Sequence, residues 1–325
     1  MSDMNMAQAL NSAMDNEMER DENVLVLGED VGVNGGVFRI TEGLYQKYGE
    51  DRVVDTPLAE SGIVGFSIGL ALAGKIPVAE MQFMGFMWPA LDQISSHASR
   101  LRNRTQGRFH VPLVVRAPYG GGVRALEHHA ESFESILAHI PGLKTVIPST
   151  PHDAKGLLIS SIRDPDPVVF LEPKRLYRLG KEEVPEEPYL EEIGKARVVE
   201  EGEDLTIVGW GSIVPKIKKA AELVGDKGID AELIDLRSVS PYDEKTVNDS
   251  VDKTGRLVVV QEAPRTMGFA SEVITRVQED VIDRMKAPAV RVTGFDVPFP
   301  FYRMEKWAMP DVDRIVKGIR EVLTW

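Results

Sequence analysis

The sequence contains no cysteine, which excludes disulfides, thiolate zinc sites, iron–sulfur clusters and cysteine nucleophiles. Long apolar runs are also missing. The longest, Ile63 to Gly74, is interrupted by Ser67, and a membrane span needs about 20 apolar residues. The first thirty residues are rich in acid, whereas a signal peptide has a basic start and an apolar centre. We therefore expect no membrane association and a cytoplasmic protein, or a mitochondrial matrix protein if a transit peptide has been removed.

Basic residues are in the minority. The chain has 38 Lys and Arg against 51 Asp and Glu, a formal net charge of −13. Nucleic-acid binding needs a basic face, so this balance argues against it, while docking of a basic partner stays open. With 325 residues, of which 43% are hydrophobic, the chain is long and apolar enough for about two folded domains.

Short β-branched runs alternate with longer amphipathic segments. Val24–Gly28 and Ile76–Glu80 are typical of buried strands, and Ala59–Ala73 and Trp88–Arg104 are predicted helices. Such alternation predicts an α/β fold in which helices cover mostly parallel sheets.

The alternation is interrupted once, by a segment rich in glutamate and proline. It divides the chain into a first domain over residues 1–180, an acidic linker over 181–200 and a second α/β domain over 201–325.

The predicted helix Ala59–Ala73 carries Gly62, Gly65 and Gly69 at three- and four-residue spacing. Each interior glycine costs about 1 kcal/mol relative to alanine. Close packing against another backbone can offset that cost. The pattern favours packing within the domain and packing against a second subunit about equally.

Common catalytic and cofactor motifs are incomplete. Gly209–Val214 follows a predicted strand, but valine occupies the third glycine position of a dinucleotide fingerprint. The six histidines show no HExxH spacing, and there is no GxSxG or GxxxxGK[ST] segment. These observations disfavour dinucleotide, zinc-hydrolase and serine-hydrolase chemistry.

Three polar residues occur where ligands of α/β proteins usually bind. Glu29 follows a predicted strand, Glu60 begins the glycine-spaced helix, and His129 follows the triple glycine Gly120–Gly122 after another strand. Glu60 has a second explanation, since a carboxylate at a helix N-terminus gains about 0.3–1 kcal/mol from the helix dipole.

These residues belong to longer segments that together resemble a known family. The chain is similar, over nearly its full length, to the beta subunit of the thiamine-diphosphate-dependent decarboxylase of 2-oxo acid dehydrogenase complexes, of pyruvate or branched-chain type. The segments that carry the resemblance are LGEDVG (27–32), DTPLAESGIVG (55–65), EMQFMGF (80–86), RAPYGGG (116–122), HAESFE (129–134), PGLKTVIPSTP (141–151) and LRSVSP (236–241).

The resemblance implies a transketolase-like pyrimidine-binding domain followed by a transketolase C-terminal-like domain. It implies that Glu60 is catalytic and exchanges a proton with the aminopyrimidine ring of thiamine diphosphate, and that Phe86 packs on that ring. It implies that His129 is also catalytic and receives or orients the lipoyl group. The other residues that it places near the cofactor are Glu29, Leu58 and Gln82.

Relatives of this kind also bind a structural K⁺ through backbone carbonyls. The resemblance places this metal site at the residues Leu113, Ser161, Asp164 and Asp166.

The resemblance further implies that the chain is one half of an enzyme. Relatives hold Mg²⁺ and the cofactor's diphosphate with a Gly-Asp-Gly segment, which does not occur here. An alpha subunit is therefore expected to supply that half, in an alpha2beta2 heterotetramer. The expected further partners are the peripheral-subunit-binding and lipoyl domains of the acyltransferase component, with Asp296 or the Trp325 carboxylate contributing to docking.

The expected reaction is oxidative decarboxylation of a 2-oxo acid and reductive acylation of lipoamide. Two alternatives stay open: an acetoin dehydrogenase beta subunit, and a non-catalytic docking partner of the same fold. The sequence does not determine which 2-oxo acid is used, because pyruvate and branched-chain acids differ by a few methylenes worth about 1–3 kcal/mol each.

Overall fold

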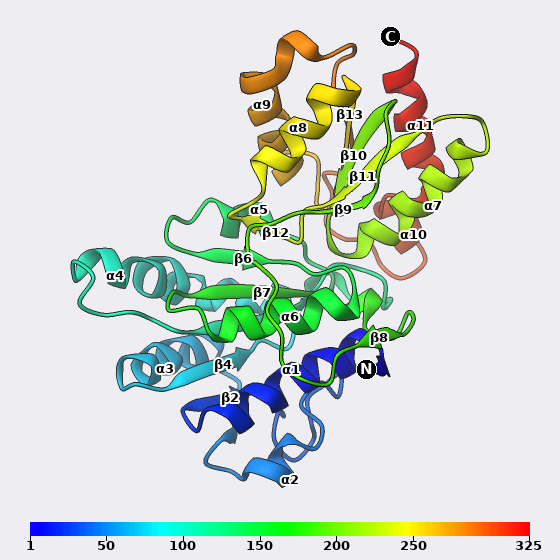
Figure 1. Ribbon diagram of the computed structural model, residues 1–325. Helices are drawn as coiled ribbons and strands as arrows, with labels where there is room; N and C mark the ends of the chain where they lie inside the picture. The colour runs from blue at the N-terminus through cyan, green and yellow to red at the C-terminus, as the bar shows by residue number, and fades with distance from the viewer.

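Two α/β bodies lie one above the other in the computed structural model, which describes residues 1–325 (Figure 1). The first body is built on a seven-stranded sheet with the order β12-β6-β7-β5-β4-β2-β3, parallel except for β12. Its strands are β2 (Val24–Gly28), β3 (Val53–Asp55), β4 (Ile76–Glu80), β5 (Val114–Tyr119), β6 (Lys144–Val146), β7 (Val168–Pro173) and β12 (Ser238–Ser240). A separate ribbon pairs β1 (Ser2–Met4) with β8 (Glu182–Val184).

The strands of the first body are apolar on both sides because helices cover both faces of the sheet. Val24 and Val26 of β2 pack in one cluster with α1 and α6, while Leu25 and Leu27 pack in another with α3 and α5. The helices are α1 (Met6–Arg20), α2 (Leu44–Tyr48), α3 (Glu60–Leu72), α4 (Leu101–Arg104), α5 (Glu134–Ala138) and α6 (Pro151–Ile162). This two-sided burial explains the continuous hydrophobic runs of the sequence.

The second body has a five-stranded sheet with the order β14-β13-β10-β11-β9, in which only β9 is antiparallel. Helices α7 and α11 cover one face, and α8 and α9 cover the other. The bounds are β9 (Arg197–Glu200), β10 (Leu205–Gly209), α7 (Val214–Gly225), β11 (Ala231–Asp235), α8 (Glu244–Thr254), β13 (Leu257–Val260), α9 (Phe269–Val281), β14 (Val290–Val292), α10 (Glu305–Ala308) and α11 (Val312–Leu323). The predicted α/β class with mostly parallel sheets is confirmed.

The two bodies share a core. Strand β12 belongs to the second part of the chain but pairs with β6 of the first sheet. Trp210, which follows β10, is buried and donates its indole N–H to Glu134 of α5 at 3.1 Å. One hydrophobic cluster runs from Ile63 of α3 to Val277 of α9. The domains are therefore packed as one unit rather than tethered.

The acidic segment 181–200 has more structure than its composition predicted. It contains β8 and β9, and Val184 of β8 is fully buried. Lys155 of α6 donates from its ammonium to the carbonyl oxygen of Pro185 at 2.7 Å. These contacts hold the segment against the first body.

The prediction of one regular helix over Trp88–Arg104 is wrong. The chain forms a 3-10 helix over Met84–Ala90, a π-helical turn over Gln93–His97 and an α-helix only at Leu101–Arg104. Pro89 lies inside the first of these, and proline has no N–H to donate to a regular α-helix. No helix of the structure has the length and apolar composition needed to span a bilayer.

A buried ion network joins the middle strands of the first sheet. Arg116 of β5 is fully buried and donates to Glu172 of β7 at 2.7 Å and to Glu80 of β4. Tyr177 donates its hydroxyl to Glu172 at 2.5 Å. Burial raises the pKa of Glu80, and the Arg116 charge opposes that rise. The single guanidinium thus compensates two carboxyl groups that have left water.

We predict that Arg116→Met lowers the free energy of unfolding by about 3–5 kcal/mol, because it leaves two acids buried without their cation. Arg102→Met is the matched control: Arg102 pairs with Asp166 at 2.6 Å but is half exposed, so its loss should cost about 0–1 kcal/mol. Urea unfolding of both variants checks this. If both variants lost an equally small part of the free energy of unfolding, Arg116 would not be the cation that stabilises the two buried acids.

The buried carboxyl group of Glu134 leads us to predict that the stability of the protein depends on pH. Burial raises its pKa to about 7 from an ordinary value of 4.5. The folded state therefore holds a proton that the unfolded state releases, and its contribution to stability falls as the pH rises from about 4.5 to about 7. Glu134→Gln should make the free energy of unfolding fall less over this range than in the wild type. Urea unfolding at several pH values measures this difference, and Glu279→Gln, at an exposed position, is the control. The prediction is refuted if the free energy of unfolding of Glu134→Gln falls with pH as steeply as that of the wild type.

Candidate functional site

The candidate site lies at one edge of the first sheet, where the parallel strands present their carboxyl ends. Glu29 directly follows β2, Gln82 follows β4, and Gly120 follows β5. All three strands run in the same direction, so the residues that follow them meet at this edge.

Glu60 lines a groove of about 460 Å³ at this edge. It is the first residue of α3 and is half buried, and no side chain caps this helix. The other lining residues are Gly85, Phe86, Trp88, Pro89, Leu126, Glu127, His128 and His129. No lysine or arginine is among them, so the groove combines an acid with aromatic surfaces and has no cation of its own.

The imidazole of His129 packs edge-on between two phenylalanines. Its ring centroid lies 4.4 Å from that of Phe83 and 5.1 Å from that of Phe86. The Nδ1 atom is buried and has no hydrogen-bond partner. Burial lowers the pKa of His129, and the positive charge of Lys174 lowers it further. The structure therefore favours a neutral imidazole at the groove.

The loop that carries His129 approaches the 3-10 helix very closely at Gly85. A side chain on Gly85 would collide with the carbonyl oxygen of His128. Only glycine fits at this position, and this contact brings His129 beside Phe86.

A second acid lies near Glu60. Glu29 is almost fully buried, and burial raises its pKa, with a further rise from the negative charge of Glu60. Burial and this repulsion both favour the protonated form of the Glu29 carboxyl group.

The structure brings together only part of the predicted cofactor set. Glu60, Phe86 and His129 line the same groove. Glu29, Leu58 and Gln82 are not among its lining residues. Leu58 is 78% exposed, which is unusual for leucine and leaves an apolar side chain for a ligand or partner to cover. The roles of these residues stay predictions.

The predicted cation site is surrounded by ion pairs. Lys144 donates to Asp164 at 2.5 Å, and Arg102 donates to Asp166 at 2.6 Å. Ser161 donates its hydroxyl to the carbonyl of Leu157, and the Leu113 carbonyl accepts from the backbone of Val168. Both carboxylates are thus neutralised, which leaves backbone carbonyls as the ligands for K⁺, and the site stays a prediction.

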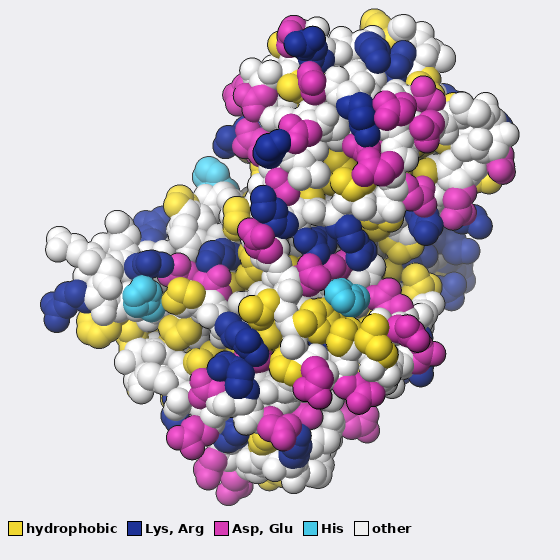
Figure 2. All heavy atoms as spheres, in the orientation of Figure 1, with side chains coloured by type: hydrophobic (Ala, Val, Ile, Leu, Met, Phe, Trp, Pro, Cys, Tyr) yellow, Lys and Arg dark blue, Asp and Glu magenta, His cyan; other side chains and the backbone are white.

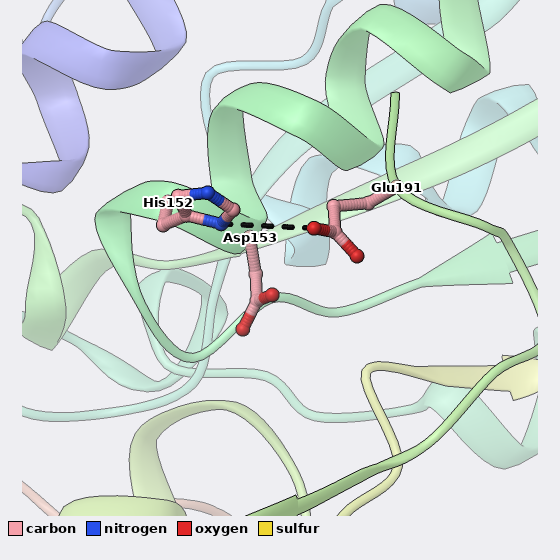
Figure 3. A group of neighbouring side chains, drawn as sticks. All are labelled: His152, Asp153 and Glu191. Atoms are coloured by element: carbon pink, nitrogen blue, oxygen red, sulfur yellow. Dashed lines mark ion pairs between the residues drawn. The ribbon is translucent and has the colours of Figure 1, made fainter. Parts of the chain in front are cut away.

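Another cluster with metal-ligand chemistry was not predicted from the sequence (Figure 3). His152 and Asp153 at the start of α6 lie beside Glu191, with the His152 Nδ1 atom 3.7 Å from the Glu191 carboxylate. Arg237 donates to both acids at 3.0 and 2.8 Å, and Arg197 pairs with Asp153 at 3.0 Å. Two guanidinium groups already neutralise these acids, so the cluster is an ion-pair network between the domains.

Comparison with known proteins identifies the family. Residues 2–180 match the family described as "Transketolase, pyrimidine binding domain", and residues 194–315 match "Transketolase, C-terminal domain". The chain is 53% identical to the pyruvate dehydrogenase E1 component subunit beta of Acholeplasma laidlawii, over 99% of this chain and 98% of that protein. It is 51% identical to the same subunit of Bacillus subtilis (strain 168), over 99% of each chain. The chain belongs to the pyruvate dehydrogenase E1 beta-subunit family.

A solved structure supports the fold independently of sequence. The protein described as "Split gene transketolase, inactive beta4 tetramer" superposes with a TM-score of 0.81 over 99% of both chains at 23% identity. The predicted resemblance to the 2-oxo acid dehydrogenase family and the predicted transketolase-like domains are both confirmed.

Sequence reasoning missed several residues of the E1 beta groove. Trp88 and Leu126 line it, and their only signal in the sequence was their position close to Phe86 and His129. Lys174 gave no signal, because it directly follows a buried strand and only the folded structure places it near His129.

Proposed function

We propose that this chain is the beta subunit of an E1 component that decarboxylates pyruvate with thiamine diphosphate and transfers the acyl group to lipoamide. The single observation that carries the proposal is the groove in which Glu60 lies with Phe86 and His129. Its acid and aromatic surfaces suit an aminopyrimidine ring. The names of the relatives favour pyruvate over branched-chain acids as the substrate.

Thiamine diphosphate, when bound, supplies a carbon nucleophile for the keto group of the substrate. The residues of this chain bind and orient it. Glu60 offers a carboxyl oxygen that gives or takes a proton at a ring nitrogen, and Phe86 offers an apolar face for the ring. The neighbouring Glu29 has a pKa raised by burial, which limits the negative charge that it adds beside the ring.

Apolar side chains of the groove would keep water from the proton transfer once a ring is bound. Trp88 and Leu126 are partly exposed at the groove, and a bound ring would cover them. A drier groove strengthens the interaction between Glu60 and a ring nitrogen, because the effective dielectric constant falls. Neutral His129 at the same groove can hydrogen-bond to a lipoyl group that enters from outside.

The charges of the groove support a split active site. A diphosphate needs Mg²⁺, basic side chains or helix N-termini, and the groove has no lysine or arginine. On the face shown in Figure 2, acidic and basic side chains are intermixed rather than gathered in a single basic patch. We therefore assign the diphosphate and its Mg²⁺ to an alpha subunit in an alpha2beta2 assembly.

Exposed apolar side chains around α3 support a subunit interface there. Phe66 and Leu72 of α3 are 59% and 43% exposed, and Leu58 precedes the helix. Gly62 and Gly69 are exposed on the same helix, and a Cβ at Gly69 would meet no atom of this chain. A partner backbone could thus approach closely, which favours the second of the two explanations for the glycine spacing.

The acyltransferase component is the proposed further partner. The Asp296 carboxylate accepts from Thr266 at 2.8 and 2.7 Å, and these hydrogen bonds lower its pKa. It is therefore a fixed negative charge. The C-terminal Trp325 is 74% exposed. Both positions are available to the basic peripheral-subunit-binding domain.

We predict that Glu60→Gln lowers kcat of the co-expressed alpha–beta pair by about 10²- to 10⁴-fold, the range that a proton-transfer group supplies. Glu244→Gln is the matched control, because Glu244 is also the first residue of a helix but lies outside the groove. Size-exclusion chromatography should show the same assembly for both variants. Full activity of Glu60→Gln, or loss of assembly with it, would refute the catalytic role.

We also predict that the chain alone binds thiamine diphosphate weakly and does not turn over, and that both properties appear on adding the alpha subunit and Mg²⁺. Isothermal titration calorimetry measures the binding, and assays with pyruvate, branched-chain 2-oxo acids and acetoin measure turnover. Robust turnover by the purified chain alone would refute the split site. Preference for acetoin would replace the pyruvate assignment.

A further inference from the structure

Lys174 is a buried lysine that the proposed function does not use. It follows β7 and is only 3% exposed, and its ammonium nitrogen has no hydrogen-bond partner. Burial lowers the pKa of Lys174 to about 8, so the side chain is still mostly charged at pH 7. A buried ammonium without a partner is costly and needs a physical explanation.

Lys174 and His129 contact the same aromatic ring. The ammonium nitrogen of Lys174 lies 6.0 Å from the centroid of Phe83, and the imidazole centroid of His129 lies 4.4 Å from it. The positive charge of Lys174 disfavours protonation of His129. The Nδ1 atom of His129 is itself buried and has no hydrogen-bond partner. Lys174 is not among the residues that line the groove. It can therefore act on the groove only through its neighbours.

The acids near Lys174 are engaged elsewhere. Glu262 of the second body accepts from the backbone N–H of Gly121 and from the hydroxyl of Ser212. Glu305 accepts from the backbone N–H of Arg124 at 2.9 Å. Both acids favour the charged lysine from a distance, but neither forms an ion pair with it. These acids thus favour the charged form of Lys174, although neither of them contacts its ammonium group.

We propose that Lys174 is a positioning residue that acts through His129: its buried charge beside Phe83 keeps the imidazole neutral while the enzyme works. The geometry around Nδ1 acts in the same direction, because a doubly protonated ring would bury an N–H that has no acceptor. The role of a neutral imidazole toward the lipoyl group rests on the proposed function. The coupling between Lys174 and His129 does not.

Burial is the largest cause that keeps His129 neutral, and Lys174 is the largest charge that adds to it. His128 also opposes protonation of the ring, Glu127 favours it, and the rings of Phe83 and Phe86 carry no charge. Glu60 of α3 lines the same groove and is a further acid. Lys174 is the buried cation that acts on His129 against these acids.

The test measures the protonation of His129 directly. Diethyl pyrocarbonate reacts with neutral imidazole, so the rate of modification of His129 against pH, followed by mass spectrometry on the alpha–beta assembly, gives its midpoint. We expect the midpoint to rise by about half a pH unit or more in Lys174→Met, because one unit charge is removed from a low-dielectric region. Lys174→Arg should keep the wild-type midpoint.

Lys216→Met is the matched control. Lys216 is also largely buried, also lies near Glu262, and donates to the carbonyl of Pro310 at 2.6 Å, but it does not act on His129. Its removal should leave the His129 midpoint unchanged. If Lys174→Met does not fold, Lys174→Gln removes the same charge and keeps a polar end.

An unchanged midpoint in the neutral variants would overturn the proposal, as would an equal shift in Lys216→Met. The acidic limb of the pH profile for lipoamide acylation is the second readout, and it should move up with the midpoint. A shifted midpoint with an unshifted acylation profile would keep the coupling and instead refute the role of His129 in acyl transfer.

Discussion

The site depends on the ion pairs that the buried guanidinium group of Arg116 forms with two acids. It joins Glu80 at the end of β4 to Glu172 near the end of β7, and Arg116 itself lies in β5 between them. Gly85 and Phe86 of the groove follow β4, and the loop that carries His129 follows β5, whereas Glu60 follows β3. A cation shared by three adjacent strands fixes their relative positions at the carboxyl edge, since neither acid can leave without exposing or stranding a charge.

Acidic and basic groups near this edge differ in exposure. The groove lining contains Glu60 and Glu127 and no lysine or arginine, whereas Arg116 and Lys174 are buried and do not line it. Such an arrangement favours binding of a neutral or cationic ring in the groove. The groove lining offers no lysine or arginine to a diphosphate. The proposed second polypeptide would account both for this lining and for the exposed apolar side chains of α3.

The second body contributes to the site through the loop that carries His129. Glu262 and Glu305 accept hydrogen bonds from the backbone of this loop, and Trp210 reaches Glu134 just after it. The domains share one hydrophobic cluster as well. These contacts tie the position of the His129 loop to the second body.

The amino-acid pattern alone was enough to assign the α/β class, because strands buried on both faces must be continuously apolar. It also indicated the family, and the same motifs pointed to Glu60, Phe86 and His129, which the structure brings to one groove. It did not determine the broken helix after Phe86 or the strands of the acidic segment, because partners distant in the chain outweigh weak local propensities there. Only the tertiary structure brought Lys174 to His129. Burial and unpaired charge are properties of a packed environment, and no pattern of neighbouring residues encodes them.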